Sequence, residues 1–212
     1  MPELTYFITL MNLFSNLVEG KQIVNIGKCR QVHSYSTLMH ILSDASLCYP
    51  LKAHLRNYVN ELYYSTQIEE DLCVEIINLE LPLLIKDLNT LIIILSKERS
   101  GRYRIMHPVR YKYLESYIYL YIEQIAYSMN YLLSDETFLT EIRKQLDFNY
   151  GHYHYYLHYF LLRIYERLRW ILNYYYGHKY IRGFLNKITN KMKEVFLIYF
   201  KDNALNVFDK SE

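Results

Sequence analysis

The sequence predicts an all-α protein, either a fragment of an armadillo- or HEAT-like α-solenoid or an irregular helical bundle. Apolar residues recur along most of the chain at the i, i+3, i+4, i+7 spacing of one helix face, and the alternation of a strand is almost never seen. Glycine and proline are rare, with 6 and 4 residues among 212, and most fall between the apolar runs. Hydrophobic residues make up 51% of the chain, enough for a packed core. We therefore expect more than about half of the residues to be helical, against a base rate of roughly one third.

The first helix should span residues 4–18, where the apolar spacing is regular and Gly20 follows at a position that favours a helix end. A second, short helix is expected at residues 34–43. A third should begin at Pro50, because proline lacks an N–H and the first helical position does not need one. Spacing and end signals together define these three helices.

The helix that begins at Pro50 carries an apolar stripe of Leu51, Leu55, Val59 and Leu62. We expect this stripe to be buried against a neighbouring helix, so that Leu55→Ala costs roughly 2–5 kcal/mol of stability. Three polar residues lie off the stripe, and we expect them to face water: Lys52, Arg56 and Asn60.

Two further helices are expected before the middle of the chain. Residues 69–78 begin with acidic side chains, which the positive end of a helix dipole favours. Pro82 should then break or kink the pattern near Leu81. Residues 83–95 are strongly apolar, and residues 92–94 are compatible with a buried strand. The length of the run and its helical neighbours favour a buried helix.

The second half of the chain should begin with a long helix from Pro108 to about residue 133. Ser134 or Asp135 can cap the shorter helix that follows, because either side chain can accept a hydrogen bond from a free backbone N–H. That helix should end near residue 148.

Two more long helices complete the predicted fold. Residues 149–151 (Asn-Tyr-Gly) mark a turn, residues 152–176 form a helix that Gly177 ends, and residues 180–200 form the last helix before a polar tail at 201–212. The helix at 152–176 has an apolar stripe with steps of four and three residues: Leu157, Leu161, Ile164, Leu168 and Ile171.

A basic loop divides the chain. We expect residues 1–200 to form one helical domain, with possible sub-units at 1–96 and 108–200 on either side of this loop. Six basic residues lie within 16 positions and are opposed only by Glu98: Lys97, Arg99, Arg102, Arg104, Arg110 and Lys112. Arginine side chains can bind phosphate through two parallel hydrogen bonds, so the segment fits an inositol phosphate, a phospholipid headgroup or an acidic partner. The alternative is a solvated loop without a ligand.

Three histidines near residue 155 do not make a convincing metal site. His154 and His158 are one helical turn apart, which is a usable spacing, but His152 should point elsewhere and no cysteine or carboxylate completes a tetrahedral set. We therefore predict no metal site and no cofactor. The motifs of nucleotide-binding loops and of nucleophilic hydrolases are missing, so we expect no enzymatic activity.

The cysteines and the hydropathy of the chain favour the cytoplasm. Three widely spaced cysteines form no CxxC pair, which is typical of a reducing compartment. The N-terminus has no basic region before its apolar run, so no signal peptide is expected. The longest candidate membrane span, residues 116–133, is interrupted by polar side chains and fits a buried helix better. A place on the cytoplasmic side of an internal membrane, within a larger assembly, remains compatible with this composition.

Residues 25–68 resemble part of the cytoplasmic helical region of inositol trisphosphate receptors, which ryanodine receptors share in outline. The resemblance lies in residues 25–27 (Asn-Ile-Gly), in residues 38–44 (Leu-Met-His-Ile-Leu-Ser-Asp) and in residues 47–64. In that family a short helix ends near Ser-Asp, a Leu-Pro-Tyr turn follows, and the next helix opens with Leu-Arg-Ala. The corresponding opening here is Leu51-Lys52-Ala53.

The segment departs from the family pattern in two places. The turn has its tyrosine and proline exchanged, as Tyr49-Pro50, and Ser65-Thr66-Gln67 stand where the family has charged residues. The resemblance covers about a fifth of the chain. It implies an armadillo-like solenoid segment of the kind that relays ligand binding toward a calcium-release pore, with no counterpart here of the pore itself.

Two classes of function follow from these patterns. The first is a non-enzymatic helical scaffold whose partner is protein, either further solenoid segments or a second copy of the chain. Because solenoid units bury their apolar faces only against the next unit, we expect an exposed apolar patch at one end at least. The alternative is a protein that binds nucleic acid or phospholipid through the basic residues 97–112 and exposed tyrosines.

Overall fold

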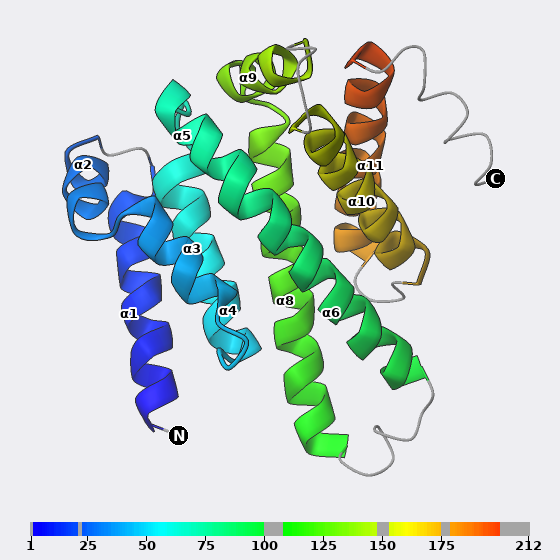
Figure 1. The fold of residues 1–212 in the computed structure, drawn as a ribbon. Coiled ribbons are helices and arrows are strands. Elements are labelled where there is room, and N and C mark those ends of the chain that lie inside the picture. Colours follow the sequence, from blue (N-terminus) through cyan, green and yellow to red (C-terminus); the bar gives the residue numbers. More distant parts are fainter. Residues whose placement is uncertain (1, 21–22, 100–107, 148–152, 175–178, 200–212) are drawn as a thin grey trace.

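The computed structural model describes residues 2–20, 23–99, 108–147, 153–174 and 179–199. In these ranges the protein is all-helical and contains no strand, and helix makes up well over half of the chain, as the apolar spacing predicts (Figure 1). The helices are α1 (Pro2–Val18), α2 (Ile23–Val32), α3 (Tyr35–Ser43), α4 (Tyr49–Val59), α5 (Glu70–Glu75), α6 (Leu81–Arg99), α8 (Pro108–Leu132), α9 (Glu136–Asp147), α10 (Tyr153–Tyr174) and α11 (Lys179–Tyr199).

Two π-helical turns join neighbouring helices into longer ones. The turn η1 (Asn60–Tyr64) extends α4, and the turn η2 (Ile76–Glu80) connects α5 to α6. In η2 the N–H of Leu81 bonds to the carbonyl of Ile76, five residues back, immediately before Pro82. Of the two outcomes expected at this proline, a break or a kink, the break does not occur, because the wider turn shifts the hydrogen-bond ladder just where the missing N–H would interrupt it.

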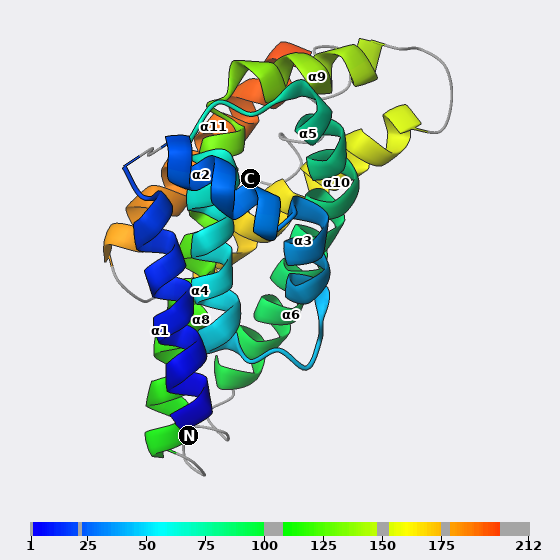
Figure 2. The same cartoon turned by 90° about the vertical axis from the view of Figure 1, so that its left-hand side faces the viewer.

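Helices that pack together are often distant in sequence. The helix α4 packs against α1 and α8, and α6 packs against α10, while α11 covers both α8 and α10. Figure 2 shows α9 lying across one end of the molecule, where it contacts α5 and α10. Among the described residues, α1 contacts α4, α2 and η1, so it forms an edge of the array.

Local signals set several helix ends as expected. Ser34 caps α3, with its Oγ accepting a bond from the N–H of Thr37 at 3.3 Å. Asp135 caps α9, with Oδ1 accepting from the N–H of Phe138 at 2.8 Å. Gly20 follows α1 with φ of +78°, the left-handed conformation that favours glycine after a helix. The sequence pattern missed α2, which has no regular apolar spacing.

The predicted stripe of α4 faces the core, but the expectation for its polar residues is wrong. Leu55, Val59 and Leu62 are buried, while Leu51 is half-buried. The three residues expected to face water are also buried: Lys52, Arg56 and Asn60. The physical reason is that α4 lies inside the array, with α1 on one side and α8 on the other, so it has no broad face left for solvent.

In the second half of the chain, the structure confirms the apolar stripe predicted for the helix at residues 152–176, which is α10. All five apolar residues of the α10 stripe are buried. The predicted turn at residues 149–151, Gly177 and the tail at 201–212 lie outside the described residues. Within the part of the chain that the structure describes, no helix has the length and hydropathy needed to cross a bilayer.

Candidate functional site

The basic residues predicted to bind an anion lie where α6 ends and α8 begins, at one end of the molecule (Figure 1). The six are Lys97, Arg99, Arg102, Arg104, Arg110 and Lys112. The first two belong to the last turn of α6 and the last two to the start of α8, whereas the middle two lie outside the described residues. The side chains of all six also lie outside them, so the anion site stays a prediction.

The histidines also remain untested as ligands. His152 lies outside the described residues, and His154 and His158 belong to α10 but have side chains outside them. Within the described ranges, no three His, Cys, Asp or Glu side chains gather as a metal ion would require.

Four charged side chains are buried together between α4 and the η2–α6 segment. Arg56 pairs with Glu80, and both side chains have 0% of their surface exposed. Arg56 Nη2 lies 3.7 Å from Oδ2 of Asp87, and Lys52 Nζ lies 3.6 Å from Oδ1 of the same carboxylate. Two positive charges therefore face two negative ones, and this internal balance limits the cost of removing all four from water. We call these four residues the buried charge cluster.

A tyrosine of α8 contacts the buried charge cluster. Tyr121 of α8 donates its hydroxyl hydrogen to Asp87, and the Arg56 guanidinium carbon lies 5.8 Å from the centre of the Tyr121 ring. Burial raises the pKa of Tyr121 far above its ordinary value, so the phenol stays protonated and keeps donating. Burial also raises the pKa of Glu80, while the neighbouring Arg56 acts in the opposite direction. The cluster thus joins α4, α6 and α8 in the interior, out of reach of a substrate.

A second buried polar group joins η1 to α8. Asn60 Nδ2 donates to the backbone oxygen of Gln124 at 3.0 Å and to its side-chain oxygen at 3.2 Å. Ser128 Oγ in turn donates to Asn60 Oδ1 at 2.7 Å. These bonds satisfy the Asn60 amide and fix where η1 lies along α8.

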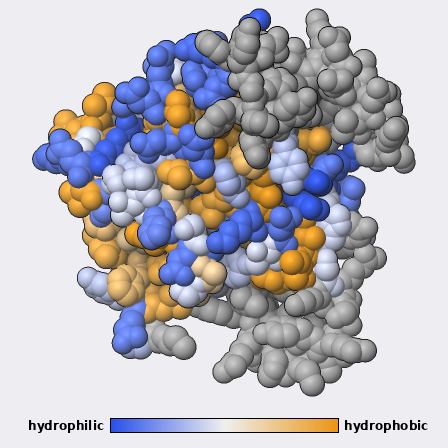
Figure 3. Space-filling view, viewed as in Figure 1, coloured by the Kyte–Doolittle hydropathy of each residue, from blue (hydrophilic) through white to orange (hydrophobic). Residues whose placement is uncertain are grey.

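Large apolar side chains are exposed on α1 and α2. Seven large apolar side chains are 41–82% exposed on these two helices: Tyr6, Phe7, Leu13, Leu17, Ile23, Val24 and Val32. We call these seven residues the α1–α2 face, although Ile23 and Val32, nine positions apart, project from different sides of α2. Hydrophobic side chains gather along this edge of the molecule in the space-filling view (Figure 3). Exposed large apolar side chains thus lie on the first helix, at one of the two ends where the patch is expected, while the side chains at 196–199, near the end of α11, lie outside the described residues.

A small pocket lies between α3 and the η2–α6 segment. It is half open, holds about 250 Å³, and is lined by Ser36, Met39, His40, Ser43, Leu79 and Leu83. Typical ligand pockets hold roughly 300–1,000 Å³ and bring several polar groups together. This pocket is smaller, and its lining includes no acid, lysine or arginine, so we assign it no ligand.

The buried charge cluster is enclosed, whereas the α1–α2 face is open to a partner. The chain matches no protein-family model, no curated protein and no solved structure. The choice between candidate sites therefore rests on geometry. The α1–α2 face is the candidate functional site that a macromolecule can reach without unfolding the protein.

Proposed function

We propose that this protein is a non-enzymatic helical scaffold that binds an apolar helical segment of a protein through the α1–α2 face. The observation that carries the proposal is the exposure of the seven apolar side chains on two adjacent helices. Single exposed apolar residues are ordinary on any protein surface, but a set gathered on neighbouring elements marks an interaction site.

The composition of α1 supports this function. Glu3 is the one charged residue between positions 2 and 18. A helix at a protein edge ordinarily directs charged side chains toward water, since an amphipathic helix has one polar face. The outer side of α1 instead offers Tyr6, Leu13 and Leu17, which suits it to an interface between helices.

The resemblance of residues 25–68 to inositol trisphosphate receptors gives the proposal a specific form. In this form the chain is a segment of a calcium-release channel's regulatory solenoid, and the neighbouring unit of the array covers its edge helix. Two observations support it: α2, α3 and α4 make the resembling segment largely helical, and α1 lies at an edge of the array. An edge with an apolar outer face is where a solenoid is continued by a further unit.

A peptide-binding experiment tests the proposed function. The probe is a fluorescent synthetic amphipathic helix with a leucine seam and uncharged flanks, and a peptide of the same composition in scrambled order is the reference. We expect fluorescence anisotropy to show micromolar binding of the seam peptide and at least tenfold weaker binding of the scrambled one. Leu13→Glu should weaken binding of the seam peptide at least tenfold, and Asn12→Glu, on an exposed polar side of the same helix, should leave it unchanged.

The same experiment separates the scaffold from the alternative function. Failure to bind the seam peptide, or binding that Leu13→Glu does not affect, contradicts the scaffold proposal. Binding of single-stranded RNA or of phosphoinositide vesicles that Arg104→Glu abolishes would favour the alternative, in which the basic residues 97–112 hold the ligand.

A further inference from the structure

We infer that the α1–α2 face pairs with its own copy, so that α1 packs antiparallel against α1 of a second chain about a twofold axis. This inference rests on the proposed function, because it uses the same face, and it goes further by naming the occupant. Three properties of α1 lead to it: a second apolar stripe, the symmetry of that stripe, and the near absence of charge.

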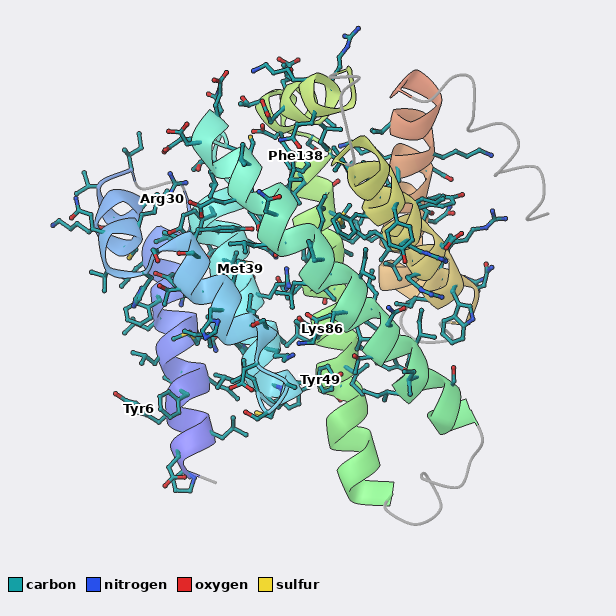
Figure 4. The ribbon with its side chains drawn as sticks, in the orientation of Figure 1. Tyr6, Arg30, Met39, Tyr49, Lys86 and Phe138 are labelled. Carbon is teal, nitrogen blue, oxygen red and sulfur yellow. The ribbon has the colours of Figure 1, made fainter. Side chains whose placement is uncertain are left out.

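The helix α1 carries two apolar stripes rather than one. The inner stripe includes Val18 and Met11, which are buried or packed against the core beside α4. The outer stripe has steps of four, three and four residues, the spacing of a coiled-coil seam: Tyr6, Leu10, Leu13 and Leu17. Figure 4 shows Tyr6 pointing away from the other helices. The inner stripe serves the fold, and the outer one is left for a partner.

The outer stripe is self-complementary in an antiparallel pair. If residue i of one copy lies opposite residue 23 − i of the other, Tyr6 meets Leu17 and Leu10 meets Leu13. A twofold interface requires such matching, because the same patch must fit itself after rotation. The antiparallel direction also sets each large tyrosine ring beside a smaller leucine and opposes the two helix dipoles favourably.

The charge of α1 permits pairing with a copy and offers nothing to select another protein. The positions that flank the outer stripe, Phe7, Thr9, Phe14 and Asn16, are all uncharged. In helical pairs the flanking charges choose the partner, either by attraction or by repulsion of like charges. Here no like charges oppose self-pairing along the stripe, and the stripe itself carries no charge that would select a different partner.

The exposed area is of the size that a dimer needs. An aromatic side chain offers roughly 150–250 Å² and an aliphatic one somewhat less. Without Val32, which lies at the far end of α2, the other six exposed side chains leave on the order of 600 Å² to cover in each copy. A standard interface buries about 800 Å² per partner. The exposed Ile23 and Val24 follow the C-terminal end of α1, so the antiparallel pair brings them toward the N-terminal end of α1 of the second copy. These contacts extend the seam beyond a single pair of helices.

Sedimentation of the full chain tests the inference. We expect a monomer–dimer equilibrium in the micromolar range. Leu10→Glu alone and Leu13→Lys alone should each weaken dimerisation at least tenfold. An equimolar mixture of the two variants should recover a 1:1 dimer, because the antiparallel register places the new carboxylate opposite the new ammonium and leaves the other two leucines together. Asn12→Glu is the matched control and should dimerise like the unaltered protein, and circular dichroism should show equal helix content in all variants.

Three results would overturn the inference. A chain that stays monomeric at several hundred micromolar has no self-pairing, and retained binding of the seam peptide would then leave the proposed function standing. A dimer that Leu13→Lys does not weaken uses another surface. Rescue by a mixture of Leu13→Glu with Leu13→Lys, without rescue by the mixture described above, would show a parallel pair instead of an antiparallel one.

Discussion

At Arg56 a guanidinium group is removed completely from water and is neutralised inside the protein. Its partners come from η2 and α6, 24 and 31 positions later in the chain, and the tyrosine ring beside it comes from α8. An isolated ion in such a place would cost several kcal/mol, so the native state depends on all four members of the buried charge cluster being present. Removing one charge is therefore more harmful than removing a pair.

Glu80→Gln should destabilise the protein strongly, by about 3 kcal/mol, because it leaves an excess positive charge among Arg56, Lys52 and Asp87 in the interior. The measurement is the free energy of unfolding from urea titration. Combining the change with Arg56→Met removes both charges and should recover part of the loss.

The matched control for this prediction is Glu166→Gln on α10. Glu166 pairs with Arg163 at 3.0 Å, but both side chains are about 40% exposed. An exposed pair contributes roughly 0–1 kcal/mol, so this change should be nearly silent. Equal losses from the two substitutions would show that the buried charge cluster is not specially sensitive.

The cysteines should differ sharply in reactivity. Cys73 is fully buried, and burial raises the pKa of its thiol from 9.0 to about 11, whereas Cys48 is exposed. A rise of that size lowers the reactive thiolate fraction roughly hundredfold, and enclosure slows the reagent further. Titration with a coloured disulfide reagent at pH 8, with Cys48→Ser and Cys73→Ser to assign the signals, should show Cys48 reacting first. Equally fast labelling of Cys73 in the folded protein would contradict the described burial.

Residue spacing could predict which apolar side chains of α4 face the core, but not the fate of its polar ones. Lys52, Arg56 and Asn60 recur every four positions, a pattern equally typical of a solvated face and of a face buried against polar partners. The partners that decide between the two, among them Glu80 and Gln124, lie far away in the sequence. Contacts between residues so far apart in the sequence form only when the helices pack together. They therefore cannot be predicted from the spacing of residues within one helix.

Among the elements, the loop between η1 and α5 is tied to α9 by one carboxylate. Asp135 caps α9 through Oδ1, and its Oδ2 accepts a bond from the N–H of Ile68 at 3.1 Å. The two oxygens thus tie the start of α9 to the chain that enters α5.

Asp135→Ala should cost about 1–2 kcal/mol, because it removes both the cap and the tie to Ile68. Asp135→Asn should cost less, because asparagine is also a good cap but has one oxygen for two donors. Urea unfolding of both variants measures the difference. If alanine and asparagine were equally costly, the charge of Asp135 rather than its two bonds would be the stabilising factor.

The helices that the sequence pattern does not predict correctly are those held by contacts with residues far away in the sequence. The segment of α2 has weak amphipathic character and contains Gly27, yet Arg30 fastens it by donating to the carbonyl of Leu62 at 3.0 and 3.1 Å and to Glu69 at 2.9 Å. By contrast, α1, α8 and α10 have long apolar stripes or clear end signals, and their approximate limits could be predicted. The π turn before Pro82 left no signature that distinguishes it from an ordinary helix.

For the whole molecule, the helical class could be predicted but the arrangement could not. The spacing of apolar residues within each helix identifies the face that is buried. Which other helix covers that face depends on how all the helices pack together. The two halves of the chain, before and after the basic segment, pack against each other. The helix α4 contacts α8, and α6 contacts α10.

Neither half should fold alone. In a fragment of residues 1–99, Asn60 loses its bonds to Gln124 and Ser128, and Asp87 loses the hydroxyl of Tyr121. We expect residues 1–99 and 108–212, expressed separately, to show no cooperative urea transition in near-ultraviolet circular dichroism, and an equimolar mixture to recover one. A cooperative transition in either fragment alone would contradict this prediction. It would show that the chain on that side of the basic segment folds as an independent sub-unit.

The buried charge cluster also constrains how this sequence can change over generations. A single substitution at position 56 or 80 passes through an intermediate that has lost about 3–5 kcal/mol, a large share of the roughly 5–15 kcal/mol that keeps a domain folded. Such intermediates are rarely tolerated, so descendants should either keep the four charges or replace them together. An alignment of sufficiently divergent descendants should then show positions 52, 56, 80 and 87 varying as one unit, while the outer stripe of α1 varies independently of them.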